Sequence, residues 1–298
     1  MPRSQSAFLD AAIDSPPVKI LDHGFVRVVD YCGDELSIER AARQSYAEDP
    51  AVRTSEERRQ LLRYLVRHRH TTPLEMCELA LQVKLPIFVA RQWIRHRMAN
   101  VNELSARYSV LDKEFYVPEL QHLGAQSASN KQGRQGVVKD AETAQALMRM
   151  HSKAAFHIYS WLLADPDAET PGYGVSRELA RIELPLSTYT TWTWKCDLHN
   201  LLHFLSLRMD PHAQYEIRVY AEEIWRLVVG WVPVVAEAFT DYRLEALTLS
   251  KQESQMLSPF ITHILDYCQT SEFLQKQLPN KRERDEFLTK LQKLDANR

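Results

Sequence analysis

Glycine is scarce in this chain, with 8 residues among 298, whereas globular proteins average about 7% glycine. The nearest approach to a glycine-rich loop is Gly172-Tyr173-Gly174, which has neither a third glycine nor a following Lys-Ser or Lys-Thr pair. A Walker loop and a dinucleotide-binding GxGxxG fingerprint are therefore absent. If the protein binds phosphate groups, we expect arginine side chains and helix ends to bind them.

The chain also lacks long apolar runs, a charge excess and paired cysteines. No apolar run approaches the roughly 18 residues that a membrane span requires, and the net charge of -2 gives no global field for nucleic acid or anionic membranes. The N-terminal stretch has no continuous apolar core and so does not resemble a secretory signal. The four cysteines form no CxxC pair. These features predict a cytoplasmic protein with reduced, buried thiols.

Hydrophobic patterning predicts an α+β fold, with a mainly antiparallel sheet and packed helices. Strict alternation from Cys77 to Leu85 indicates a half-buried strand, and the β-branched and aromatic runs 25–31 and 187–194 indicate two more. Apolar spacing and terminal prolines predict helices, with caps at Thr54, Asp140, Ser176, Asp197 and Asp210. These expected helices cover residues 54–70, 86–98, 140–163, 176–184, 197–209 and 210–232. Residues 99–109 are expected to form a loop that carries function.

Two segments stand apart in composition. Residues 121–139 form the one low-complexity stretch and are expected to be a surface insertion. Residues 246–298 have few aromatics, many charges and a helical apolar pattern near the end, which predicts a helical C-terminal extension. We therefore predict one main domain in residues 1–245.

The segment 91–109, RQWIRHRMANVNELSARYS, carries four arginines and only one acid, Glu103. Guanidinium groups this close repel one another unless acids or a bound anion compensate them. One interpretation is a solvated basic face that pairs with acids elsewhere. The other is a phosphate or pyrophosphate site. The second is favoured by the interleaved amide and hydroxyl groups of Asn100, Asn102, Ser105 and Tyr108, which could bind a polar heterocycle.

This segment closely resembles the signature of the flavin-dependent thymidylate synthases, RHRxxSxNExSxRY. The matching residues are Arg95-His96-Arg97, Asn102-Glu103, Ser105 and Arg107-Tyr108. Asn100 stands where the family usually has its first serine. Asparagine keeps hydrogen-bonding capacity but is larger and has no hydroxyl, so Asn100 is assigned no definite role.

Further segments extend the resemblance over roughly residues 20–245. Residues 68–75 are similar to the family's HxHxTPxE stretch, and residues 177–185 look like its RExARxxLP segment. Residues 198–208 and 211–218 resemble its last conserved block. The resemblance implies a thymidylate synthase-complementing-protein-like fold with the catalytic domain in residues 1–245.

The resemblance implies an enzyme that reductively methylates dUMP to dTMP. In this family 5,10-methylenetetrahydrofolate is the carbon donor, NADPH reduces bound FAD, and the reduced flavin supplies the hydride. The family assembles as a homotetramer with active sites shared between subunits. The dense apolar faces of residues 140–163 and 211–238 fit burial against partner copies. The face expected on 140–163 comprises Leu147, His151, Ala154, Ile158 and Trp161.

The resemblance also implies site residues. Those expected to bind dUMP are Gln92, Arg95, Glu103, Ser105, Arg107, Arg181 and Arg208. Those expected to bind FAD are His70, Thr72, Arg95, His96, Arg97, Glu103, Asp197, His199 and His203. Arg208 is the expected catalytic residue, because a cation near N3 and O4 of uracil favours the deprotonated ring and makes C5 more nucleophilic.

Simpler roles stay open for the arginines. Arg208 lies in an otherwise apolar helix, so it is expected to be paired or functional, and the pairing alternative is a salt bridge to Asp210 or Glu216. Arg181 could pair with Glu178 at i,i+3 spacing.

Two functions from other classes also compete. His199 and His203 have the i,i+4 spacing of metal ligands, which would suit a metal-dependent hydrolase, but the Glu of HExxH and a third ligand are missing. The Arg-rich segment could instead serve a nucleic-acid-binding module, although the chain has no further basic stripe. We expect no bound metal and no nucleic-acid partner.

Overall fold

A computed structural model of the chain describes residues 5–44, 54–129, 133–169, 171–270 and 272–296. The chain divides into two compact units, Met1–Leu244 and Glu245–Arg298. The first unit contains the sheet and the segments that carry the family resemblance. None of the described helices is both long and apolar enough to cross a bilayer.

The first unit is built on a five-stranded sheet with the strand order β1-β2-β3-β7-β4, in which every neighbouring pair is antiparallel. The strands are β1 (Val18–Ile20), β2 (Gly24–Cys32), β3 (Glu78–Pro86), β7 (Tyr189–Asp197) and β4 (Asn100–Glu103). The alternating side chains of β3 put Leu79, Leu81, Val83 and Leu85 fully into the core. The α+β prediction with a mainly antiparallel sheet is therefore confirmed.

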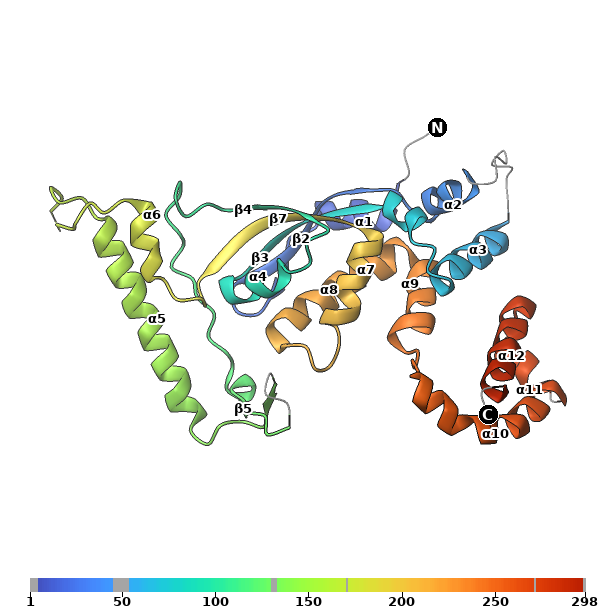
Figure 1. Ribbon diagram of the computed structural model, residues 1–298. Coiled ribbons are helices and arrows are strands. Elements are labelled where there is room, and N and C mark those ends of the chain that lie inside the picture. The colour runs from blue at the N-terminus through green and yellow to red at the C-terminus, as the bar shows by residue number, and fades with distance from the viewer. Residues whose placement is uncertain (1–4, 45–53, 130–132, 170, 271, 297–298) are drawn as a thin grey trace. The chain divides into compact units, whose positions relative to one another are not determined.

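Helices cover one face of this sheet, and Figure 1 shows α7 (Leu198–Arg208) and α8 (Tyr215–Trp231) together beneath it. Trp93, the last residue of α4 (Ile87–Trp93), stacks on Phe204 of α7 with ring centroids 4.7 Å apart. Trp192 and Trp194 of β7 meet Trp93 edge-on. This aromatic cluster fixes the end of α4 against the middle of α7, and both elements carry predicted site residues.

The other helices of this unit are α1 (Ala7–Asp14), α2 (Glu35–Gln44), α3 (Ser55–Arg67), α5 (Ala141–Leu163), α6 (Arg177–Ala180) and α9 (Pro233–Phe239). Short turns are η1 (Thr72–Met76), η2 (Leu120–His122), η3 (Arg181–Glu183) and η4 (Thr240–Leu244). A two-stranded hairpin, β5 (Ala125–Gln126) and β6 (Arg134–Gln135), lies within the predicted 121–139 insertion, of which residues 130–132 fall outside the described residues.

Helix caps predicted from the sequence are present at three helices. Thr54 and Glu57 form a capping box at α3, Asp140 caps α5, and Asp197 caps α7. Ser176, by contrast, makes no side-chain cap bond at α6, which is only four residues long and continues as the 3-10 turn η3.

Three predicted boundaries were wrong. Helix α4 ends at Trp93, because the next amides turn back in tighter bonds, Arg95 to Gln92 and His96 to Trp93, and the chain then leaves for the sheet. Residues 100–103 of the expected loop pair with β7 as strand β4. Helix α8 begins at Tyr215 and not near Pro211, because Asp210 accepts bonds from the His212 and Ala213 amides in a separate turn.

The apolar face predicted on 140–163 is not part of the core of the chain. Helix α5 buries Ser152, Ala155, Phe156 and Tyr159. The predicted face, which we call the α5 stripe, is exposed and comprises Leu147, His151, Ala154, Ile158 and Trp161. The apolar face of α8 and α9 is instead buried within the chain itself, so the prediction that residues 211–238 present a face to partner copies was wrong.

The second unit consists of α10 (Lys251–Thr270), α11 (Glu272–Gln277) and α12 (Lys281–Asp295). Its buried apolar residues include Ile261, Leu274 and Leu291, one from each helix. The cysteines are unpaired, and Cys77 and Cys196 are buried as expected, but Cys32 is exposed because it ends a strand whose side chains alternate between the two faces.

Candidate active site

A cavity of about 500 Å³ lies between the segment that follows α4 and one face of α7. Two segments about a hundred residues apart in sequence form its walls. The lining residues are Arg95, His96, Arg97, Met98, Cys196, Asn200, His203, Leu207 and Arg208. The fold thus brings four of the residues expected to bind FAD to the residue expected to activate uracil.

The local sequence orients α7 so that its polar residues face this cavity. Asp197 begins the helix by accepting bonds from the backbone amide of Asn200 at 3.0 Å and from its side-chain amide at 2.8 Å. Asn200, His203 and Leu207 recur at helical spacing and line the cavity. Asp197 itself serves as a helix cap here, and its expected contact to FAD stays a prediction.

Arg208 and His96 are bonded to each other in the cavity. The Nε atom of Arg208 donates to Nε2 of His96 at 3.0 Å. The salt bridges considered for Arg208 do not form, because Asp210 bonds His212 at 2.9 Å and Glu216 pairs with Arg134 at 3.0 Å. Arg208 therefore keeps its charge facing a neutral partner.

The protonation state of His96 follows from its surroundings. Burial, followed by the nearby charge of Arg208 and then by His203, lowers the pKa of His96 from 6.5 to about 4. His96 is therefore neutral at pH 7, and Nε2 is free to accept from Arg208. Burial also lowers the pKa of Arg208, but a guanidinium stays protonated at physiological pH.

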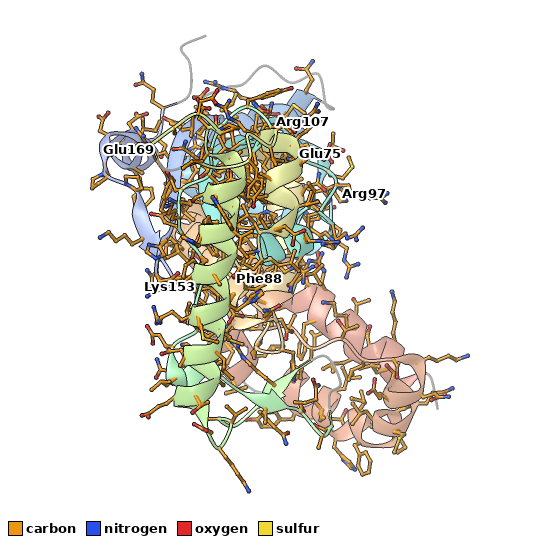
Figure 2. The ribbon with its side chains drawn as sticks, turned by 90° about the vertical axis from the view of Figure 1, so that its left-hand side faces the viewer. Glu75, Phe88, Arg97, Arg107, Lys153 and Glu169 are labelled. Carbon is orange, nitrogen blue, oxygen red and sulfur yellow. The ribbon has the colours of Figure 1, made fainter. Side chains whose placement is uncertain are left out.

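Arg95 and Arg97 supply uncompensated positive charge at the mouth of the cavity. Both side chains are exposed, and neither has a carboxylate partner within the described part of the chain. Figure 2 labels both Arg97, which lines the cavity, and Arg107, which does not line it and pairs with Glu178. The basic residues of the motif therefore do not form one continuous stripe, which argues against the nucleic-acid interpretation.

A second cluster forms where the motif meets α6. Arg107 pairs with the Glu178 carboxylate at 3.2 Å, and Arg181 reaches the Glu178 carbonyl oxygen at 3.4 Å. The side-chain pair considered between Arg181 and Glu178 is therefore replaced by a pair with Arg107. The Ser105 hydroxyl accepts the backbone amide of Arg107 at 3.3 Å. Two arginines and a serine expected to bind the dUMP phosphate and sugar thus lie together, away from the cavity.

The remaining predicted residues occupy separate positions. Glu103 on β4 accepts from the Thr190 hydroxyl of β7 at 2.7 Å. Gln92 donates its side-chain amide to Gln214. His70 and Thr72 stand at the start of η1, which packs against α7, but they do not line the cavity. No three His, Cys, Asp or Glu side chains among the described residues come together as a metal site, so the third ligand required by the hydrolase alternative is missing there.

Comparison with known proteins decides the family. Residues 27–234 match the model of the family described as thymidylate synthase complementing protein. A curated flavin-dependent thymidylate synthase of Gluconobacter oxydans (strain 621H) is 56% identical over 236 residues, which cover 78% of this chain and 76% of the relative. The chain belongs to the flavin-dependent thymidylate synthase family. Another such relative, from Ruegeria pomeroyi, is 54% identical over 235 residues, with coverage of 78% and 76%.

A solved structure is similar to this member of the family in fold as well as in sequence. The UMP/dUMP methylase PolB from Streptomyces cacaoi, crystallised with 5-Br dUMP, is 32% identical and has a TM-score of 0.68. The similarity covers 76% of this chain and 99% of that chain. The α10–α12 unit lies outside the residues that match the family model.

Four cavity residues of this family member were not predicted from the sequence: Met98, Asn200, Cys196 and Leu207. Asn200 and Leu207 had a usable signal, because each lies three or four positions from His203 on the same helix. Cys196 had no usable signal in the sequence, because its position at the cavity depends on how β7 pairs with β3 and β4. Its thiol donates to the Met98 carbonyl at 3.3 Å, and burial raises its pKa, so it is no nucleophile here.

Proposed function

We propose that this enzyme catalyses the reductive methylation of dUMP to dTMP, with 5,10-methylenetetrahydrofolate as carbon donor and NADPH as reductant of bound FAD. The main observation behind this proposal is that Arg208 and His96 of the RHR motif are hydrogen-bonded to each other in one cavity. The names of the relatives and the dUMP methylase fold neighbour support this reaction class.

The residues around the cavity fit a flavin nucleotide. Arg95 and Arg97 are exposed and have no carboxylate partner among the described residues, so they suit a diphosphate, whereas a glycine-rich cradle is absent from the sequence. His96 and His203 offer ring faces and nitrogen atoms in the same cavity. The other residues that we assign to FAD are His70, Thr72, Glu103, Asp197 and His199. When bound, reduced FAD supplies the hydride for the methyl group.

We assign binding of the dUMP phosphate and sugar to the Arg107 cluster. The Glu178 carboxylate pairs with Arg107, whereas Arg181 bonds the Glu178 carbonyl oxygen and has no carboxylate partner among the described residues, so the cluster keeps a positive excess. A phosphate dianion compensates that excess with charge-assisted hydrogen bonds. Ser105 and Gln92 add neutral donors, and Arg95 and Glu103 complete the dUMP set.

Arg208 polarises the uracil ring in this proposal. Its partner His96 is neutral, so the charge of the guanidinium is not cancelled by the residue that orients it. Partial burial strengthens its interaction with charge that develops at N3 and O4. Stabilising that charge raises electron density at C5, the carbon that accepts the new methyl group.

We propose further that the enzyme works as a cytoplasmic homotetramer with shared active sites. Two observations support this. The α5 stripe exposes Leu147, Ile158 and Trp161 by 56%, 46% and 48%, and such apolar surface is typical of an interface. In a single chain, Arg107 and Arg181 do not line the cavity that holds Arg208, so a partner's cluster is needed to complete the site.

The test is formation of dTMP by the purified protein, followed by chromatography, with each component omitted in turn. We expect dTMP only when dUMP, methylenetetrahydrofolate and NADPH are all added to the flavin-loaded protein, and none after the flavin has been removed. The visible spectrum of freshly purified protein should show a flavin. A protein that carries flavin but forms no dTMP from the complete mixture would refute the proposed reaction.

A further inference from the structure

Two side chains of the 121–139 insertion contact the first turn of α8. The ring of His122 stacks on Tyr215 with centroids 3.7 Å apart and planes inclined by 19°. The guanidinium carbon of Arg134 lies 5.7 Å from the centre of the Tyr215 ring, and its Nη1 atom lies 3.0 Å from Oε1 of Glu216. We call these four residues, His122, Arg134, Tyr215 and Glu216, the α8 clamp.

Glu216 depends on Arg134 for its charge compensation. Its side chain is 2% exposed, and Oε1 also accepts from the Tyr116 hydroxyl at 3.1 Å. The second oxygen, Oε2, is buried and has no hydrogen-bond partner in the described part of the chain. Arg134 is the one cation paired with this carboxylate among the described residues. A buried carboxylate that loses its cation must move towards water or take up a proton.

The clamp is connected to the expected dUMP site through two contacts with α4. Gln214 is the N-cap of α8, two residues before Glu216, and its side-chain oxygen accepts from Gln92 of α4. Its carbonyl oxygen accepts hydrogen bonds from the amides of Ile217 and Arg218, so Gln214 moves together with the first helical turn. The second contact runs from Tyr116 to Phe88 of α4, with ring centroids 5.9 Å apart.

Packing alone does not fix this junction. A cavity of about 390 Å³ lies among these elements, and Phe88, Tyr116, Arg134, Gln214 and Glu216 are among its lining residues. Unfilled space on one side of a side chain removes the contacts that would hold it there. Trp93 of α4 packs on Tyr220 of α8 with ring centroids 6.0 Å apart, and at the start of α8 the polar contacts of the clamp add to this packing.

We propose that Arg134 is a positioning residue for dUMP binding. By holding Glu216, it fixes the first turn of α8, and through Gln214 it fixes the Gln92 side chain at the substrate site. This inference rests on the proposed function, because the role of Gln92 in binding dUMP comes from that proposal. It gives residues 121–139, which carry none of the motifs of the family resemblance, a part in substrate affinity.

The experiment compares Arg134→Gln with Arg134→Lys and with Lys139→Gln in the full-length, FAD-loaded enzyme. Lys139 is an exposed cation of the same segment, so its loss is the charge-matched control. We expect Arg134→Gln to raise the KM for dUMP roughly 3- to 30-fold, the usual range of coupling through a positioning contact. The kcat at saturating dUMP and the NADPH oxidation without dUMP should change less than about twofold.

Two rescues separate positioning from a general structural role. Arg134→Lys keeps the cation and should restore most of the dUMP affinity. The double variant Arg134→Gln/Glu216→Gln removes the uncompensated charge and should bind dUMP better than Arg134→Gln alone. An unchanged KM for dUMP in Arg134→Gln, or a lower melting temperature with unchanged dUMP affinity, would overturn the proposal.

Amide hydrogen exchange tests the clamp independently of the reaction. In Arg134→Gln, exchange should accelerate at residues 214–218 and also at residues 88–94, and it should not change in Lys139→Gln. Acceleration confined to the insertion would contradict the connection to α4. If the wild-type enzyme forms no dTMP, the proposed function fails, and the exchange data still decide whether the clamp positions α4.

Discussion

The Nε atom of Arg208 donates a hydrogen bond to Nε2 of His96 at 3.0 Å, although the two residues are 112 positions apart in sequence. The bond joins the residue expected to polarise uracil to one expected to bind FAD. It also orients the guanidinium without neutralising it, because His96 is uncharged at pH 7. Under the proposed function, substrate activation and flavin binding are coupled at this junction.

The first prediction concerns the titration of His96. Replacing Arg208 by Gln should raise the pKa of His96 above about 4, because one positive neighbour is lost, but not fully to 6.5, because burial is the larger cause. An NMR pH titration of labelled histidines measures this. Arg218→Gln, which alters an arginine paired with Glu222, is the control and should leave His96 unchanged. An unchanged His96 pKa in Arg208→Gln would contradict the assigned geometry.

The same pKa shift has a consequence for stability. The pKa of His96 is lower in the folded state than its ordinary value of 6.5, so protons bind the unfolded chain more readily. The contribution of neutral His96 to stability is complete above about pH 6.5 and is lost as the pH falls towards 4. Denaturant unfolding at several pH values should show this loss in wild type and less of it in His96→Gln. An equal loss in both proteins would assign the acid sensitivity to other groups.

The second prediction concerns the dUMP phosphate. Arg107→Ala and Arg181→Ala should each weaken dUMP binding by about 1.5–3 kcal/mol, or roughly tenfold or more, because a charged hydrogen bond is lost. Calorimetric titration with dUMP measures this. Arg226→Ala is the control, since Arg226 is exposed and pairs with Glu223. An unchanged affinity for dUMP in both test variants would mean that the Arg107 cluster is a solvated surface and not the phosphate site.

The third prediction concerns FAD. His203 lies on the face of α7 that lines the cavity, with its ring 6.1 Å from that of His96. His203→Ala should weaken FAD binding by about 1 kcal/mol or more, which is about fivefold or more. Flavin release on dilution, followed by fluorescence, measures this. His212→Ala, at an exposed residue outside the cavity, should bind FAD normally. If His203→Ala also binds FAD as tightly as wild type, the placement of FAD is wrong.

The fourth prediction concerns assembly. A glutamate in place of Ile158 puts a charge into the α5 stripe, where burial against a partner copy would be strongly unfavourable. Light scattering should show a species smaller than the tetramer proposed for the wild type, and dTMP formation should fall with it. Lys153, which Figure 2 labels beside α5, is exposed but lies outside the stripe, so Lys153→Glu should leave the assembly intact. A wild-type mass for Ile158→Glu would exclude this interface.

Local chemistry explains which parts of the fold were predictable from the sequence. The capping box of Thr54 and Glu57 and the alternation along β3 are determined by neighbours within a few residues, and both are present. The strand β4 was not predictable, because Asn100–Glu103 has no apolar alternation and becomes a strand by pairing with β7. The end of α4 at Trp93 was likewise decided by distant partners, namely Phe204 and the β7 tryptophans.

The site shows the same division. The resemblance named both Arg208 and His96, but their hydrogen bond depends on the packing of α7 and is invisible in the sequence. Glu216 was considered as a partner for Arg208, whereas the structure gives it to Arg134 of the insertion. No local pattern predicts a pair between residues 82 positions apart. Pairs of side chains that are distant in sequence could be identified only from the folded structure.

The role of Arg208 is tested most directly by single-turnover formation of dTMP at saturating dUMP, in wild type and in Arg208→Lys. Lysine keeps the charge but loses the planar fork, so we expect the rate constant to fall at least about tenfold and NADPH oxidation by bound flavin to survive in part. This result would place Arg208 in the activation of uracil. A normal rate constant, with only a higher dUMP requirement, would contradict that role and make Arg208 a binding residue.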